Sequence, residues 1–343
     1  MKRIGMALLA AAITGLCLWV LVTPQVLQAL GRLRADAKPA PLIAAFVLAG
    51  LVQWLRAWRF AVMTSGRSTL PDAPMVLIAL KLNFLNFVLP FRLGELGYPA
   101  LMHQQYGHGL LRSAGVLLLA RLFDLTTVVA ILLGAAALLL SAPAAQTAAL
   151  LALGVALAPF ALVGLGAALL PRLKDKLAGA SLASSLASSL ASRFGSRLGA
   201  GLARFARDPA PHADWVAGLR SIGRGPLRLV VGLGFAIWLT FGLAAVLVAA
   251  AVVDTVAPSA ALLGAAAGNI AFALPVNGLA GLGPAQAAWV LATTWAGVPR
   301  ADAIVSALAL HAVVLGNALL FGALALGCGL GRGRALPGGQ PSP

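Results

Sequence analysis

The sequence predicts an all-α polytopic membrane protein, with about six spanning helices and two re-entrant helical hairpins in an inverted repeat. Hydrophobic residues make up 61% of the 343 residues, and the mean hydropathy is +0.95, well above that of soluble domains. Two apolar stretches, one in each half of the chain, are interrupted by clusters of proline and glycine. Paired interruptions of this kind indicate a transporter-type binding site near the middle of the bilayer.

Full spans are predicted wherever an apolar run reaches the roughly 20 residues that a helix needs to cross the hydrocarbon core. The run after Lys2 and Arg3 resembles a signal peptide, but it approaches spanning length and no small-residue cleavage site follows promptly. We therefore expect it to be the first transmembrane helix. The predicted spans are residues 4–23, 41–63, 115–141, 145–170, 227–253 and 301–327.

The interrupted stretches are residues 75–107 and 259–297, and each half is about 15 residues long, too short to span. Such broken segments are tolerated at membrane depth only where protein or a water-filled cavity covers the backbone. We therefore predict two re-entrant hairpins. Their breaks run from Pro90 to Gly97 and from Pro275 to Pro284.

The charge distribution predicts an orientation. Lys and Arg outnumber Asp and Glu by 25 to 9, and ten of these cations lie between Arg172 and Arg228. A basic loop beside membrane spans marks the cytoplasmic side and attracts anionic lipid headgroups. Nucleic-acid binding could also explain the positive charge, but the sequence contains no nucleic-acid-binding motif.

With this loop and both termini in the cytoplasm of a bacterial cell, the chain lies in the inner membrane and the two hairpins enter from opposite faces. Arg56 and Arg59 are then expected near the cytoplasmic face. The exception is an outside loop that carries Arg32, Arg34 and Lys38.

We expect residues 1–330 to form one transmembrane domain and 331–343 a disordered cytoplasmic tail. The cytoplasmic loop 171–226 contains Leu182, Leu186 and Leu190 at a spacing of four. That spacing suits an amphipathic helix on anionic headgroups. A solvated Ala/Ser linker is the open alternative.

Charged residues at the first break are the main candidates for binding, because a charge inside a membrane helix costs about 2.5–3.5 kcal/mol and tends to be paired or functional. Arg92 and Glu95 flank Gly94 there. Arg92 could grip a headgroup phosphate with two hydrogen bonds, while Glu95 pairs with Arg92 or with a cationic headgroup. Alternatively, the break lies at the aqueous interface and both charges are solvated.

Other polar residues have simpler explanations. Arg121 and Asp124 are three positions apart, so they share a helix face and predict an intrahelical pair. They belong to the site only if that face borders Arg92 and Glu95. Lys81 is expected to extend to the interface. For Asn83, Asn86, Asn269 and Asn277, capping of half-helices is the simpler interpretation and lining of a cavity the alternative.

No cofactor or metal is expected. Cys17 and Cys328 lie in apolar segments and are interpreted as packing residues. His103, His108 and His311 belong to no metal-binding pattern. No nucleotide-binding or hydrolase motif is present, so we expect no covalent step.

The string Leu89-Pro90-Phe91-Arg92-Leu93-Gly94-Glu95, with Arg121 and Asp124 after it and Gly281-Leu282-Gly283 in the second half, resembles the flippase-like membrane family. This family is also called the lysylphosphatidylglycerol synthase transmembrane region. The resemblance covers residues 1 to about 330 and implies movement of lipids between leaflets, as in the members that move aminoacylated phospholipid or accompany polyprenol- and hopanoid-lipid pathways.

The chain departs from the family pattern at Gln286, where the second motif usually has Glu. Compared with the family pattern, the chain therefore lacks an acid that could pair with a headgroup amine. The Pro/Gly tail from Leu336 also predicts that no aminoacyl-transferase domain is present.

The leading hypothesis is a lipid translocase that takes a phospholipid or a polyprenyl- or hopanoid-type lipid. We expect Arg92, Glu95, Arg121 and Asp124 on one wall of its cavity, and Asn277, Gly281, Gly283 and Gln286 on the other. An integral membrane enzyme that uses Glu95 or Asp124 as a base, a non-catalytic scaffold for lipid synthesis and a solute transporter stay open. The expected partners are membrane lipids with anionic headgroups and no nucleic acid; lipid-synthesis enzymes and a second copy of the chain also stay open.

Overall fold

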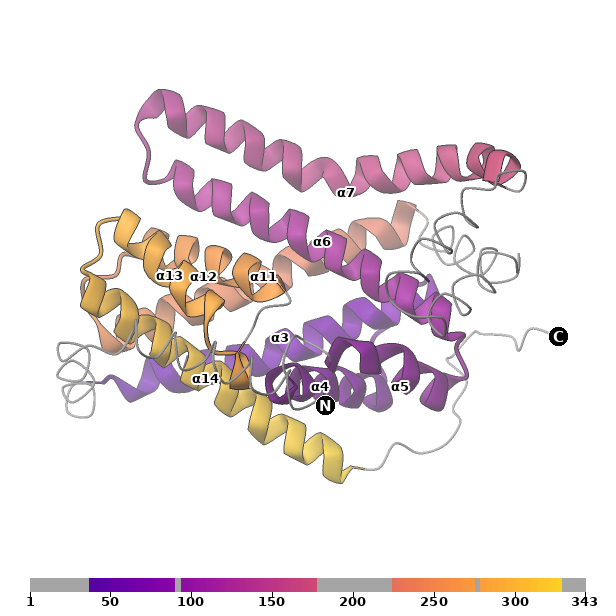
Figure 1. Cartoon of the computed structure of the whole chain (residues 1–343), viewed down its shortest axis with the longest axis horizontal. Coiled ribbons are helices and arrows are strands. Elements are labelled where there is room, and N and C mark those ends of the chain that lie inside the picture. The colour runs from indigo at the N-terminus through magenta and orange to yellow at the C-terminus, as the bar shows by residue number, and fades with distance from the viewer. Residues whose placement is uncertain (1–36, 90–93, 178–223, 275–277, 329–343) are drawn as a thin grey trace, which may run out of the picture.

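A computed structural model describes residues 37–89, 94–177, 224–274 and 278–328, and all the regular elements within these ranges are helices (Figure 1). The predicted all-α fold class is confirmed. The order of long and short helices is the same in both halves. The first half has α3 (Pro39–Ser65), α4 (Ala73–Val88), α5 (Gly97–Tyr106) and α6 (Leu110–Ala137). The second has α11 (Arg224–Val252), α12 (Pro258–Ala273), α13 (Pro284–Trp295) and α14 (Arg300–Gly327), and α7 (Ala142–Leu177) lies between the halves in sequence.

Five helices of the described ranges, namely α3, α6, α7, α11 and α14, are long and apolar enough to cross a membrane. They lie where five of the six spans were predicted. The first predicted span, residues 4–23, lies outside the described residues. So do the tail 331–343 and nearly all of the basic loop, because α7 ends at Leu177 and α11 begins at Arg224.

The short helices α4 and α12 have 16 residues each. At about 1.5 Å per residue they reach about 24 Å, short of the roughly 30 Å hydrocarbon core. Both end for the same reason: Leu89 and Leu274 have extended backbones, which a following proline imposes on the residue before it. The breaks therefore lie where the sequence predicts them, and their re-entry into the membrane stays a prediction.

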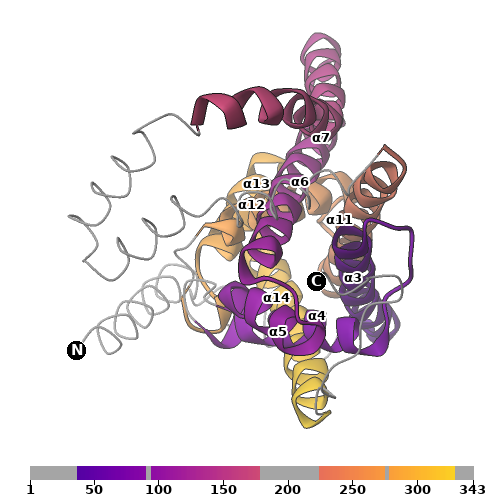
Figure 2. The same ribbon diagram turned by 90° about the vertical axis from the view of Figure 1, so that its right-hand side faces the viewer.

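The two halves pack reciprocally. α6 of the first half packs against α12 of the second, and α14 of the second packs against α4 of the first. α3 and α11, which begin the two halves, pack along each other and lie together on one side of the bundle in Figure 2. This exchange of equivalent helices is what a two-fold relation between the halves requires, and it supports the predicted repeat.

Two apolar cores lie among the helices, and each includes residues from both halves. Buried side chains of α3, α4, α5, α6 and α11 form the first, with Phe60, Ile78 and Phe123 among them. The second lies mainly among α11, α12, α13 and α14 and includes Trp289 and Ile304. α7 contacts α6 and lies at the edge of the molecule in both views, so it contributes little to either core.

A charged cavity between the two breaks

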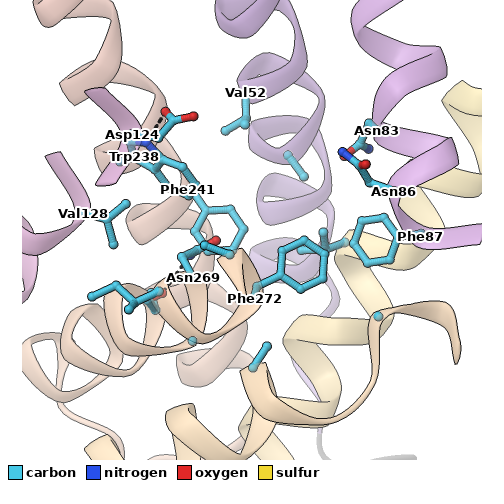
Figure 3. A pocket seen from close by; sticks show the side chains of 18 of the residues that line it. Val52, Asn83, Asn86, Phe87, Asp124, Val128, Trp238, Phe241, Asn269 and Phe272 are labelled. Carbon is cyan, nitrogen blue, oxygen red and sulfur yellow. Dashed lines mark hydrogen bonds between the residues drawn. The ribbon is translucent and has the colours of Figure 1, made fainter. Parts of the chain in front are cut away.

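A cavity of about 650 Å³ is lined by residues from both halves of the chain. Figure 3 shows Asp124 and Trp238 on one side of it and Asn83 and Asn86 on the other, with the ring of Phe272 between them. Most of the wall is apolar. The polar lining residues are Gln53, Arg56, Asn83, Asn86, Glu95, Arg121, Asp124, Asn269, Gln286, His311 and Asn317.

Asp124 on α6 is the centre of a buried charge cluster. Its carboxylate accepts four hydrogen bonds, two from Arg59 at 2.6 and 3.0 Å, one from Arg121 at 3.0 Å and one from the Trp238 indole at 2.8 Å. A carboxylate has about four lone-pair sites. The acceptor capacity of Asp124 is therefore filled by the protein itself.

Arg121 joins this cluster to the first break. It donates from Nε to Glu95 at 3.0 Å and from a terminal nitrogen to Asp124, also at 3.0 Å. The predicted pair of Arg121 and Asp124 is confirmed, and the face that carries it borders Glu95 as the binding hypothesis requires. The predicted contact of Glu95 with Arg92 lies outside the described residues, as do Pro90, Pro275 and Asn277.

Arg59 was not predicted as a site residue, and its side chain is only 1% exposed. Its expected position near the cytoplasmic face stays a prediction. The bidentate contact with Asp124 offsets the desolvation of its charge. Arg56 also lines the cavity, 5.4 Å from the centre of the Trp238 ring. The three-residue spacing of Gln53, Arg56 and Arg59 was the available signal, because it places polar groups on one helix face.

Gly94 is required by a close approach of the first turn to α4. A Cβ atom there would lie 2.5 Å from the carbonyl carbon of Leu85 and 2.6 Å from the backbone nitrogen of Asn86. Any larger residue would push the turn away from α4. Gly94 therefore holds Glu95, its neighbour, at the cavity.

The second break is a tight turn with left-handed backbone at three residues, Ala280 (φ 55°), Gly281 (φ 75°) and Gly283 (φ 129°). Glycine adopts such angles without strain. Gly281 also lies against the rings of Phe87 and Phe272, whose centroids are 5.7 Å apart. The two breaks therefore meet across an aromatic contact.

Gln286 holds this turn to α14. The Gly283 N–H donates to its Oε1 at 2.7 Å, and its Nε2 lies 2.9 Å from Nδ1 of His311. The predicted residues Gly281 and Gln286 thus line the same cavity as Glu95, Arg121 and Asp124. His311 was considered only as a metal ligand, so its contact with Gln286 was missed.

The capping interpretation is wrong for the described asparagines. Asn83 and Asn86 lie inside α4 and Asn269 inside α12, and all three line the cavity. Asn269 donates to the Ala265 carbonyl of its own helix, while Asp72 caps α4. Lys81 extends to the Cys328 carbonyl at 3.4 Å, at the end of α14 where helix carbonyls favour a cation.

Within the described residues, no three His, Cys, Asp or Glu side chains are grouped as a metal site would require. Helices of spanning length and a cavity that holds a buried charge cluster, lined by two similar halves, define a multi-pass helical membrane protein.

The family model described as the lysylphosphatidylglycerol synthase TM region matches residues 7–322. The chain belongs to this family, and the resemblance inferred from the motifs is confirmed. Comparisons with curated proteins and with solved structures gave no match.

Proposed function

We propose that the protein transfers an anionic lipid between the leaflets of the bacterial inner membrane, with both termini in the cytoplasm. One observation carries the proposal: the charge cluster lies in a cavity whose wall includes exposed leucines. Leu96, Leu122 and Leu125 line the cavity and are 71%, 43% and 47% exposed. A headgroup could occupy the polar interior while its acyl chains stay in the bilayer beside these leucines.

The charge balance of the cluster favours an anion. Arg56, Arg59 and Arg121 bring three positive charges, and Glu95 and Asp124 bring two negative ones. Arg121 is 29% exposed, whereas Arg59 is 1% exposed. Arg121 therefore contacts the phosphate in our proposal and Arg59 holds Asp124 in place. Arg92, outside the described residues, is proposed as a second phosphate ligand.

The reciprocal packing of the two halves supports transfer by alternating exposure. Two similar halves around one site can rock against each other and open it to either face. The contact of Phe87 with Phe272 joins the breaks, and we propose that it separates the cavity from one face at a time.

The proposal needs no covalent step. An enzyme that used Asp124 as a general base would need a free lone pair on its carboxylate, and all four sites accept hydrogen bonds from Arg59, Arg121 and Trp238. The enzyme alternative therefore depends on Glu95.

The test is a leaflet-exchange assay. Purified protein is placed in liposomes that carry acyl-chain-labelled fluorescent phosphatidylglycerol in both leaflets, and dithionite bleaches the outer one. We expect fluorescence to fall well past half with the native protein and to stop near half with Arg121→Ala. Lys38→Ala, at a side chain 58% exposed, is the matched control and should behave as native.

A plateau near half with the native protein, without dithionite leakage and across anionic, zwitterionic, aminoacylated and polyprenyl lipids, would contradict the proposal. It would favour the enzyme or the scaffold. Size-exclusion profiles of each variant show whether a loss reflects unfolding.

A further inference from the structure

We propose that Gln286 and His311 form the neutral counterpart of the Glu95–Arg121 ion pair, and that they select a lipid whose phosphate-linked headgroup carries uncharged hydroxyl groups rather than an amine. This inference rests on the proposed function and names its substrate class.

The two pairs occupy equivalent places in the two halves. α6 and α14 have 28 residues each; Arg121 is the twelfth residue of α6 and His311 the twelfth of α14. Each reaches back to a side chain beside a break: Arg121 contacts Glu95 at 3.0 Å, and His311 contacts Gln286 at 2.9 Å. One pair is charged and the other is neutral.

The hydrogen bonds of Gln286 determine which nitrogen of His311 carries the proton. The Gly283 N–H donates to Oε1 of Gln286, so this oxygen is an acceptor and the amide nitrogen faces His311. An amide nitrogen only donates. Nδ1 of His311 is therefore the acceptor, and the proton of the neutral ring lies on Nε2.

The Nε2–H group is then a donor that needs an acceptor. Nε2 is buried without a hydrogen-bond partner among the described residues, on a side chain that lines the cavity. An ammonium group has three donors and no acceptor, whereas a hydroxyl both donates and accepts. A hydroxyl can therefore pair with Nε2–H, and an ammonium group cannot.

Two further unpartnered polar groups of the cavity are also neutral. The Oδ1 atoms of Asn86 and Asn317 are buried without a partner in the described part of the chain, and both residues line the cavity. Each can accept from a hydroxyl or from an ammonium group, so the discrimination between the two headgroups depends on the Nε2–H group of His311. The described carboxylates that line the cavity, Glu95 and Asp124, both accept from Arg121.

A carboxylate at position 286 would reverse the polarity of the pair. It can only accept, so Nδ1 of His311 would have to carry a proton and Nε2 would present a lone pair or complete an imidazolium. Gln286→Glu would also bring a negative charge to this wall. Both changes favour an amine headgroup, or remove the preference for hydroxyls.

The first measurement is nitrogen NMR of the full-length protein with ¹⁵N-labelled histidine, with His311→Asn used to assign the signal. We expect the proton of His311 on Nε2 in the native protein and on Nδ1, or on both nitrogens, in Gln286→Glu. Gln53→Glu adds the same charge elsewhere in the cavity and should leave the His311 signal native. A native His311 protonated on Nδ1 would overturn the inference.

The second measurement compares exchange of acyl-chain-labelled phosphatidylglycerol and phosphatidylethanolamine. We expect the native protein to exchange the lipid with the glycerol headgroup about tenfold faster, because one mismatched buried hydrogen bond has an effect of about this size. Gln286→Glu should lose most of this preference. Equal exchange of both lipids, or an unchanged ratio in Gln286→Glu, overturns the inference while the proposed function stands.

The third measurement is the melting temperature in detergent, which reports headgroup binding without any lipid exchange. Dioctanoyl phosphatidylglycerol should raise the melting temperature more than dioctanoyl phosphatidylethanolamine, since a ligand that binds the folded state stabilises it. Equal shifts would contradict the selection. An equal effect of water-soluble glycerol phosphate would overturn the assignment to a lipid.

Discussion

Arg59 and Asp124 form a bidentate ion pair between α3 and α6, with hydrogen bonds of 2.6 and 3.0 Å, and their side chains are only 1% and 7% exposed. These residues are 65 positions apart in sequence. The pair fixes α3 against α6 and holds Asp124 where Arg121 and Trp238 can also reach it. The position of the polar wall of the cavity therefore depends on this contact.

We expect Asp124→Asn to destabilise the protein by about 3–5 kcal/mol, because it leaves the charge of Arg59 buried without its counter-charge. A lower melting temperature in detergent would show this. Asp254→Asn is the matched control: Asp254 pairs with Lys38 at 2.9 Å but is 88% exposed, so its loss should cost no more than about 1 kcal/mol. Equal melting temperatures of the two variants would contradict this role of Asp124.

Trp238→Phe should destabilise the protein more than Trp289→Phe. Trp238 donates to the charged Asp124 carboxylate at 2.8 Å, whereas Trp289 donates to the hydroxyl of Ser306 at 3.1 Å. Bonds to charged groups contribute about 1.5–3 kcal/mol and neutral ones about 0.5–1.5 kcal/mol. Both tryptophans are buried, so the loss of ring area is similar. Melting temperatures of the two variants test the order, and the reverse order would show that Asp124 does not depend on the indole.

The helices and breaks were predictable because their signals are local. Apolar length determines where α3, α6, α11 and α14 lie, and a proline after Leu89 or Leu274 ends the helix before it. The pairing of Arg121 with Asp124 is local in the same way, since residues three apart share a helix face.

The partners across the cavity were not predictable, because they depend on how distant helices pack. Arg59 carries the same charge as Arg56, and only the packing of α3 against α6 shows that it meets Asp124. His311 finds Gln286 from 25 positions away for a similar reason. The capping interpretation of Asn83 is wrong because Asn83 lies inside α4, where the backbone N–H groups already have partners within the helix.

His108 makes the stability depend on pH. It lies between α5 and α6, where burial and the neighbouring Arg112 lower its pKa to about 4. In the unfolded chain its pKa is about 6.5, so between these values the unfolded state binds a proton that the folded state does not. Above about pH 6.5 the residue therefore does not lower the free energy of unfolding. As the pH drops toward 4, the free energy of unfolding falls, because protonation of His108 favours the unfolded state.

We expect His108→Gln to reduce the loss of melting temperature between about pH 6.5 and 4.5. Above pH 7 the variant should show no such pH-dependent difference from the native protein. If the melting temperatures of the two proteins fell equally between about pH 6.5 and 4.5, the depressed pKa of His108 would be contradicted.

Gly94→Ala should disrupt the first break, whereas Gly97→Ala should not. The new Cβ at position 94 would lie 2.5 Å from the Leu85 carbonyl carbon, a backbone atom of α4, while at position 97 the nearest atom is a Leu85 methyl at 3.6 Å. Overpacking of this kind costs about 1–3 kcal/mol. Because Glu95 follows directly, its contact with Arg121 should be displaced and lipid exchange should fall together with the melting temperature. Gly97→Ala makes an ordinary contact and should leave both unchanged; a loss of exchange in that variant alone would show that the close approach at Gly94 does not position Glu95.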